Sequence, residues 1–395
     1  MKKPIHKIVF SKKDWSKWEW QQNNVVRDIR LLSGYFTKIS QKYFDDLYNK
    51  SKNLKFQITP YILSQISRNI SVEELEKNPW FLQFFPIGEI YRMGPDAYDG
   101  TENWDLAEEF PTSNIHHKYT NRALIRLRTC LSYCNFCFEA LGTLEKKPKL
   151  EKLFKWSDWN KSLEYIAKHR EIEEVILSGG EPLLLSDSML DKIFKDLSRI
   201  KNVRFRRIHT RASTHNPFRI TDNLVRIFKK YKVNEIAFDV AHPSEITSDF
   251  KDAVRKIRKG MGEDSPILVT HTPLVKNLNA DAMVLWDLFA KLYELNVKPY
   301  YLIHSFPHTP FADQQRVSVR DGIRLVNKLK RHKSNIAIPE YIVAHYNGKI
   351  TVPLEINGTP EFQYLKDNKN NPIIKFLNWK KKWVTYPDCK DTIKD

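Results

Sequence analysis

Three of the four cysteines in this chain of 395 residues lie within eight positions, as Cys130, Cys134 and Cys137. Three thiolates in one short loop can bind three irons of a 4Fe–4S cluster and leave the fourth iron without a protein ligand. An open iron can bind and cleave a small molecule, just as a catalytic zinc keeps an open position. The alternatives are a chance cluster of thiols and a structural zinc, which needs a fourth ligand nearby. The spacing therefore predicts a catalytic iron–sulfur site.

A glycine turn stands where it could complete this site. A short β run at 174–178 ends in Gly179 and Gly180, and the cysteines follow another β run at 123–128. Glycine lets the backbone approach a ligand closely. In parallel α/β barrels, chemistry gathers at the carboxyl ends of the strands. We therefore expect the cysteines and the glycines at one end of the fold.

Strands alternate with helices from about residue 120. The expected strands are 123–128, 174–178, 203–209, 235–240, 267–270 and 298–303, and the expected helices are 157–170, 187–200, 221–232, 248–260, 280–296 and 318–333. This alternation predicts parallel βαβ units and an α/β fold, a partial (β/α)6 barrel. The chain then divides into an N-terminal helical extension (1–115), the barrel (116–335) and a C-terminal segment (336–395). The last begins with a β-hairpin around Asn347-Gly348 and continues as a polar tail.

Composition narrows the class of protein. So few and such clustered cysteines argue against a disulfide framework and favour a metal site in a reducing compartment. The formal net charge of +18 suits an anionic partner, but Lys and Arg are scattered along the chain, so nucleic-acid binding is not expected. No apolar run predicts a membrane span, and no apolar stretch follows the basic N-terminus as in a secretory signal. We expect a cytoplasmic protein.

The spacing CxxxCxxC after the first barrel strand resembles that of the radical S-adenosylmethionine (SAM) superfamily. In that superfamily the cluster binds SAM at its open iron. Ser178-Gly179-Gly180-Glu181 looks like the family motif that contacts the amino group of SAM. The resemblance implies SAM as a cofactor, a small-molecule substrate, and a one-electron donor such as flavodoxin or ferredoxin as a partner.

A closer resemblance, to the lysine 2,3-aminomutase family, extends from about Asp14 to Pro353. No single matching segment is specific to the family, but the shared order of the segments makes a chance match unlikely. In chain order they are Asp14–Gln21, Ile58–Tyr61, His117–Arg122, Thr210-Arg211, His242–Thr247 and Lys298–Tyr301. The resemblance implies that Thr210, Arg211 and His242 join the glycine turn in binding SAM.

Family members also carry pyridoxal phosphate (PLP) on a lysine in a Gly-rich turn, and Lys349 lies at the matching place. Such a lysine needs a position that faces the barrel mouth and a lowered pKa. By the same resemblance, Tyr119 stacks on the pyridine ring and Arg122 holds the phosphate. The alternative is that Lys349 is a solvated residue of the hairpin turn, and that Tyr119 and Arg122 are ordinary loop residues.

The departures from the family concentrate where its members bind the substrate. Glu139 stands in a segment where the family has a basic run, and a carboxylate there repels the substrate carboxylate. Two Asp residues hold the ε-ammonium in lysine-specific members, and the matching places here are Phe306 and, if a gap is allowed, Ala344. The cysteines of the family's interfacial zinc are missing, apart from Cys389, which is otherwise a free thiol. Three histidines at the expected mouth are either polar contacts or structural residues: His271, His304 and His308.

Two enzymatic hypotheses remain. The favoured one is a PLP-dependent radical SAM aminomutase that moves an amino group from C2 to C3 of an amino acid other than free L-lysine. The alternative is a radical SAM enzyme without PLP that modifies a bulkier or anionic substrate, such as a peptide, a nucleotide or a natural-product intermediate. A non-enzymatic electron-transfer or scaffold protein would leave the glycine turn without a purpose. The sequence is compatible with a monomer and with a homo-oligomer.

Overall fold

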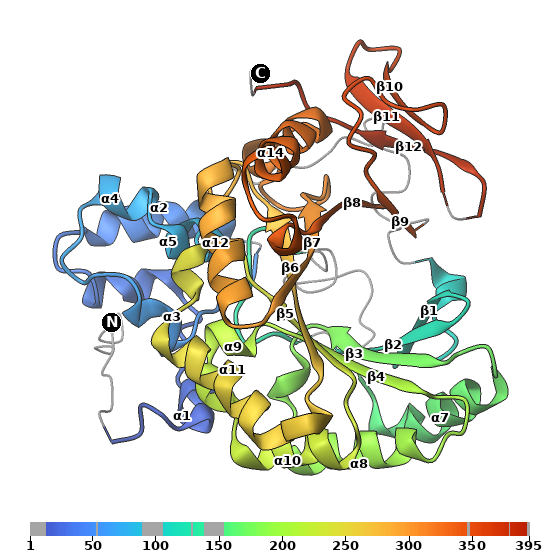
Figure 1. Ribbon diagram of the computed structural model, residues 1–395. Coiled ribbons are helices and arrows are strands. Elements are labelled where there is room, and N and C mark those ends of the chain that lie inside the picture. Colours follow the sequence, from blue (N-terminus) through green and yellow to red (C-terminus); the bar gives the residue numbers. More distant parts are fainter. Residues whose placement is uncertain are drawn as a thin grey trace.

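The computed structural model describes residues 13–52, 54–88, 106–127, 129–137, 154–345, 348–378 and 380–392. These residues form an N-terminal helical region, a curved α/β sheet and a small C-terminal sheet (Figure 1). The predicted fold class, a partial α/β barrel with a helical N-terminal extension, is confirmed.

The main sheet has nine strands in the order β1 to β9. Their bounds are β1 Ile115–Tyr119, β2 Arg122–Leu127, β3 Glu174–Gly179, β4 Phe205–Thr210, β5 Glu235–Asp239, β6 Ile267–Leu274, β7 Lys298–His304, β8 Glu340–His345 and β9 Gly348–Thr351. Strands β2 to β8 pair in parallel. β1 and β9 pair antiparallel at the two ends, so all strands from β2 to β8 end on the same side.

Helices cover the outer face of this sheet, with α8, α10, α11 and α12 clearly outside the strands in Figure 1. Their bounds are α7 Trp159–Lys168, α8 Asp187–Ser198, α10 Asp222–Lys230, α11 Ser248–Met261, α12 Ala282–Glu294 and α14 Val319–His332. Hydroxyl or carboxylate side chains cap most of their first turns, as with Ser186 for α8 and Thr247 for α11. Alternate strand residues such as Ala123 and Ile125 are fully buried against these helices.

The six predicted strand–helix units are present, and the sheet continues beyond them. The predicted hairpin is confirmed, because β8 and β9 pair antiparallel with His345 opposite Gly348. Its first arm is also a seventh parallel strand, since Leu302 of β7 pairs with Tyr341 of β8. The hairpin therefore belongs to the barrel sheet, and it carries Lys349 to the inner edge of that sheet.

The N-terminal region packs a second hydrophobic core against the cysteine loop. Its helices are α1 Trp18–Asn23, η1 Ile29–Gly34, α2 Gln41–Ser51, α3 Pro60–Ser64, α4 Val72–Glu76 and α5 Pro79–Phe84. Apolar side chains from η1 and from α2 to α5 form one cluster that includes Cys134 and Phe136 of the cysteine loop. The extension therefore holds the loop from outside the barrel.

Short elements follow several strand ends or connect the larger ones. They are η3 Ala107–Glu109, η4 Trp156–Asp158, η5 Pro182–Leu184, α9 Ala212–His215, η6 Pro217–Arg219, η7 Pro243–Glu245, η8 Gly262–Asp264, α13 Ala312–Gln315 and η9 Asn335–Ala337. Of these, η5, α9 and η7 come directly after β3, β4 and β5, so they shape the carboxyl end of the barrel. No helix in the described part of the chain is long and apolar enough to cross a membrane.

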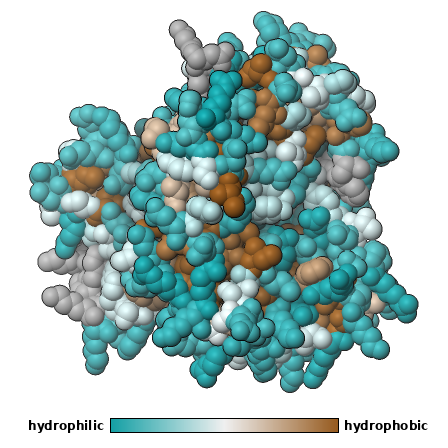
Figure 2. Space-filling view, viewed as in Figure 1, coloured by the Kyte–Doolittle hydropathy of each residue, from teal (hydrophilic) through white to brown (hydrophobic). Residues whose placement is uncertain are grey.

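The segment after the hairpin was predicted as a polar tail, and this was wrong. It forms a separate antiparallel sheet of β10 Phe362–Lys366, β11 Pro372–Leu377 and β12 Trp383–Pro387. One face buries Ile374, Phe376 and Tyr386, whereas Leu365 and Trp383 remain 43% and 46% exposed. Figure 2 shows hydrophobic atoms over this upper right part, as well as in the centre and at the left of the same face.

Candidate functional site

The cysteine loop follows β2 at the carboxyl end of the barrel strands. Cys134 is buried, and the other two cysteines are partly exposed. The Gln57 side chain donates hydrogen bonds to two successive loop carbonyls, those of Cys130 at 3.0 Å and Leu131 at 2.9 Å. The Gln57 carbonyl accepts one from Tyr133 N at 3.1 Å. A single residue of the N-terminal region thus fixes the backbone of the loop at three points.

The three thiols fit the donor set of an open cluster. Burial, and then the negative charges of Cys130 and Cys137, raise the pKa of Tyr133, so both thiols lie near that ring. Among the described residues, no three His, Cys, Asp or Glu side chains are close enough to hold a single metal ion. The thiolates of a cubane bind three different irons and lie farther apart than the ligands of one ion. The loop is therefore suited to a cluster.

The glycine turn lies against the backbone that leads into the cysteine loop. Gly179 has a φ of +97°, which side chains other than glycine rarely adopt. A Cβ at Gly179 or Gly180 would collide with the backbone of Leu127 or Thr129, respectively. Glu181 N donates a hydrogen bond to Thr129 O at 2.8 Å. The glycines therefore permit the end of β3 to lie beside the cysteines.

Glu181 ties the turn after β3 to the turn after β4. It is 4% exposed, and its carboxylate accepts hydrogen bonds from Leu183 N at 2.9 Å, Thr210 Oγ1 at 2.6 Å and Arg211 N at 2.8 Å. Burial raises the pKa of Glu181 to about 7 even though these donors oppose the shift. The structure thus brings Glu181, Thr210 and Arg211 together, as the resemblance required, while their contact with SAM stays a prediction.

Glu181→Gln is expected to be tolerated better at pH 8 than at pH 5. The pKa of Glu181 in the folded protein, about 7, lies above its ordinary value of 4.5, so ionisation costs more in the folded state than in the unfolded state. The wild type therefore loses stability as the pH rises through this interval, by on the order of 3 kcal/mol, whereas glutamine does not titrate. Urea unfolding of both proteins at the two pH values measures the difference. A cost of the substitution that does not change with pH would contradict the expectation.

Arg211 connects the cysteine loop to the turn after β5. Its guanidinium donates to Cys134 Sγ at 2.9 Å, to Gln83 Oε1 at 2.9 Å and to Glu245 Oε2 at 2.7 Å. The Glu245 side chain is 0% exposed, so this ion pair is buried. Burial alone would lower the pKa of Arg211, but the charges of Cys134, Glu245 and Asp239 raise it. Arg211 therefore remains a cation beside the cysteine loop.

His242 follows β5 and caps the short helix η7. Its Nδ1 accepts a hydrogen bond from Ser244 N at 3.1 Å. Its backbone N–H donates to Glu245 Oε1 at 2.9 Å, as does that of Ala241. Burial lowers the pKa of His242 to about 4, so the ring is neutral at neutral pH. The structure gives His242 a capping role, and its predicted contact with SAM stays a prediction.

Lys349 lies on β9, where the free edge of the sheet approaches β1. Its backbone N–H donates to Tyr119 Oη at 3.0 Å, and its Nζ lies 4.0 Å from the ring centre of Tyr301. Burial, and then the charges of Arg122 and Arg207, lower the pKa of Lys349 to about 8. Lys349 is therefore a partly buried amine that loses its proton readily, which differs from a solvated turn lysine.

Aromatic rings connect Lys349 with the turns after β4 and β5 across the barrel interior. The ring of Tyr301 lies 5.5 Å from that of His271, and His271 lies 4.7 Å from His209. His271 Nδ1 is 3.6 Å from Asp239 Oδ1. Burial, and then the charges of His271, Arg207 and Lys349, lower the pKa of His209. Lys349 and the loops at the carboxyl ends thus border one interior.

The other residues that were expected at the mouth of the barrel have different surroundings. His304 is fully buried, and its Nδ1 lies 2.8 Å from Tyr341 Oη, so it is a structural residue. Phe306 is 5% exposed and packs in the main core, with its ring 5.5 Å from that of His308. Glu139 lies outside the described residues.

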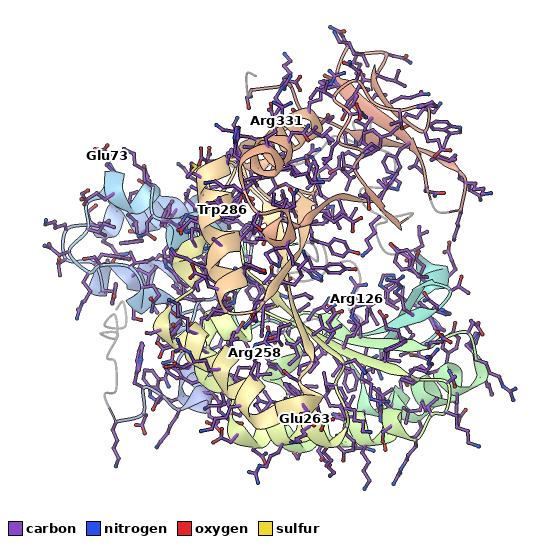
Figure 3. All side chains as sticks on the ribbon, viewed as in Figure 1. Glu73, Arg126, Arg258, Glu263, Trp286 and Arg331 are labelled. Atoms are coloured by element: carbon purple, nitrogen blue, oxygen red, sulfur yellow. The ribbon has the colours of Figure 1, made fainter. Side chains whose placement is uncertain are left out.

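Three residues near the site were not singled out from the sequence. Arg126, labelled in Figure 3, is a 4% exposed cation on β2, and its guanidinium carbon lies 5.2 Å from the ring centre of Phe110. Arg126 could have been recognised from the sequence, because it is a charged residue within the hydrophobic run of this strand. Gln57 and Gln83 carry no such signal, because polar residues are common outside strands.

Comparisons with known proteins agree with this geometry. A family model described as the radical SAM superfamily matches residues 124–272. The L-lysine 2,3-aminomutase of Methanococcus maripaludis is 30% identical over 347 residues, which cover 87% of this chain and 76% of that protein. The glutamate 2,3-aminomutase of Clostridioides difficile is 28% identical over 382 residues, which cover 96% and 84%, respectively.

One solved structure, described as coproporphyrinogen III oxidase (HemN) from Escherichia coli, a radical SAM enzyme, matches with a TM-score of 0.35 and 13% identity. That match covers 59% of this chain and 62% of the other, and it is too distant to add to the assignment. The relatives with higher identity span most of both chains, and the predicted cluster and SAM segments meet in the structure. The chain is therefore a radical SAM enzyme that belongs to the lysine 2,3-aminomutase family as a divergent member.

Proposed function

We propose that this enzyme uses PLP to move an amino group between adjacent carbons of an amino acid other than free L-lysine. The observation that carries the proposal is Lys349, whose pKa is lowered to about 8 at the inner edge of the barrel. About a tenth of an amine with this pKa is unprotonated at pH 7 and can bond to the aldehyde carbon of PLP, whereas an ordinary lysine is almost fully protonated. Two relatives are named as 2,3-aminomutases, which supports this class of reaction.

The described residues fit the cofactors that the family implies. Cys130, Cys134 and Cys137 would hold the 4Fe–4S cluster. The SAM site would comprise Ser178, Gly179, Gly180, Glu181, Thr210, Arg211 and His242. When bound, the cluster and SAM supply a radical that removes hydrogen from a substrate carbon, and PLP supplies the π-system through which the nitrogen moves.

The chain's own residues supply positioning and a dry environment. Tyr119 holds the backbone of Lys349 through its hydroxyl. Arg122, whose guanidinium carbon lies 5.0 Å from the ring centre of Tyr119, is the candidate for the phosphate of PLP. Tyr300 and Tyr301, with ring centres 3.9 Å apart, cover the inner face beside Lys349. Such rings exclude water from the position of the reacting atoms.

Two positions argue against free L-lysine as the substrate. Phe306 and Ala344 stand where lysine-specific members carry carboxylates, Phe306 packs in the core, and Ala344 lies directly across from Lys349 in the β8–β9 pairing. An ε-ammonium buried at these positions would find no compensating charge from either residue, which costs free energy. The proposed substrate therefore carries a side chain without a cation at that end.

Covalent trapping tests the proposal. The protein is reconstituted without oxygen, incubated with PLP, reduced with borohydride and digested for mass spectrometry. We expect a pyridoxyl group on Lys349, with labelling that falls as the pH drops below about 8, because protonation removes the nucleophile. Lys349→Arg should abolish the label, whereas Lys118→Arg, which changes a neighbouring lysine on β1, should retain it. Formation of 5′-deoxyadenosine from SAM without any label on Lys349 would overturn the proposal.

The net charge of +18 favours a second candidate function, modification of a bulkier anionic substrate without PLP. In that case Lys349 would contact an anionic group of the substrate instead of bonding to PLP. The trapping experiment separates the two functions, because only the first predicts a covalent adduct at this lysine.

A further inference from the structure

We propose that a groove on the N-terminal region, directly outside the cysteine loop, is the docking surface for an acidic one-electron carrier protein. The inference rests on the proposed assignment of Cys130, Cys134 and Cys137 as cluster ligands, and it is independent of PLP and of amino migration. The groove has a volume of about 260 Å³, and its lining includes Arg27, Tyr48, Lys55, Phe56, Gln57 and Tyr133.

Two residues that line the groove also contact the cysteine loop. Tyr133 belongs to the cysteine loop, lies beside Cys130 and Cys137, and also lines the groove. Gln57 lines the groove too, and its side chain donates to the carbonyl of Cys130. Electron tunnelling weakens exponentially with distance, so a groove whose lining includes a residue of the cysteine loop is a suitable place for a carrier to bind.

The positive charge of the groove favours an acidic partner protein. Arg27 is exposed, and its Nε donates to Gln57 Oε1 at 3.0 Å. The Nζ of Lys55 lies 5.8 Å from the ring centre of Tyr133. Neither cation forms an ion pair with any residue that the structure describes. The nearby carboxylate of Asp28 is paired with Arg30 at 2.6 Å, so the rim of the groove presents uncompensated positive charge.

Small redox carriers bind through weak, transient interfaces in which charge complementarity sets the encounter rate. The overall charge of +18 would attract an acidic carrier from a distance, and Arg27 and Lys55 would orient it over Tyr133. In the transfer step the carrier is oxidised by one electron and the cluster is reduced by one electron, and no bond breaks.

The test compares two variants with the same change in charge. Lys55→Glu with Arg27→Gln alters the groove, and glutamine keeps a donor for Gln57. Lys201→Glu with Arg170→Gln is the matched control, since these exposed residues precede β4 and β3 at the opposite end of the barrel. The probe is an acidic flavodoxin in its reduced form. The measured quantity is the rate constant for cluster reduction by flavodoxin divided by that for reduction by dithionite, which needs no docking.

At low ionic strength we expect this ratio to fall about tenfold in the groove variant and to stay at the wild-type value in the control. At high ionic strength the ratios of the groove variant and the wild type should become equal, because salt screens the charges. As a readout independent of activity, carbodiimide should cross-link flavodoxin carboxylates to Lys55. Equal ratios in the two variants, or cross-links only elsewhere, would overturn the proposal. If the double variant loads no cluster, Lys55→Glu alone carries the same test. Failure to trap PLP on Lys349 would leave these outcomes unchanged.

Discussion

Replacing Cys134 with serine is expected to reduce SAM cleavage to the level of the iron-free protein. Cys134 is the buried member of the three cysteines, and its sulfur accepts a hydrogen bond from Arg211 at 2.9 Å. A serine hydroxyl is a poor ligand for iron in such a cluster, and two remaining thiolates cannot hold three irons. Iron and sulfide analysis, the paramagnetic resonance signal of the reduced protein, and chromatography of 5′-deoxyadenosine measure the loss.

Cys389→Ser is the matched control for this substitution. Cys389 lies near the C-terminus after β12, where its N–H donates to Asp388 Oδ1 at 2.8 Å. Burial raises the pKa of this thiol, so it is held mainly as an uncharged group. We expect the control to keep its iron content and its 5′-deoxyadenosine formation. Equal iron loss in both variants, or a fully loaded Cys134→Ser protein, would remove the support for the assigned ligands.

Arg211→Met is expected to lower the free energy of unfolding by about 3–5 kcal/mol, because it leaves the carboxylate of Glu245 buried without its cation. That carboxylate is 0% exposed, and its other described partners are two backbone N–H groups, those of Ala241 and His242. The donor to Cys134 Sγ is lost as well. Urea unfolding of preparations with matched iron content, with the slope checked for each protein, measures the change.

A second substitution distinguishes an unpaired charge from a simple loss of packing. Glu245→Gln added to Arg211→Met keeps an acceptor for the two backbone N–H groups and removes the buried charge, so it should restore more than half of the lost stability. Arg255→Met is the control, because Arg255 pairs with Asp252 at the surface with side chains 66% and 69% exposed. We expect that control to change stability by less than about 1 kcal/mol. A double variant no more stable than the single one would contradict the explanation.

Membership in the family does not by itself settle the substrate. Proteins named as glutamate and as lysine 2,3-aminomutases both match this chain at similar identity. Phe306 and Ala344 are therefore the positions at which substitution with Asp should first be tried, with lysine binding as the readout. Their surroundings, a core position and a position opposite Lys349, differ enough for the two to respond separately.

The amino-acid sequence by itself determined the cluster loop, the glycine turn and six strand–helix units, because each is a local pattern of spacing or periodicity. It also contained the alternation of Ile374 with Phe376 and of Val384 with Tyr386. Those strands were missed because frequent Lys and Asn residues made the segment resemble a polar tail. The seventh parallel strand was likewise visible only as one arm of a hairpin.

Only the tertiary structure decided which distant residues meet. Gln57 reaches a loop 73 positions later in the chain, and Arg211 bonds to Gln83, 128 positions earlier. Such contacts follow from strand order and layer packing, which local propensity does not encode. The proton affinity of Lys349 was decided in the same way. Burial lowers its pKa first, and cations from β2 and β4, Arg122 and Arg207, lower it further. The resemblance had already named this lysine as a candidate, and the packing adds the physical reason why its amine is a better nucleophile than that of a solvated lysine.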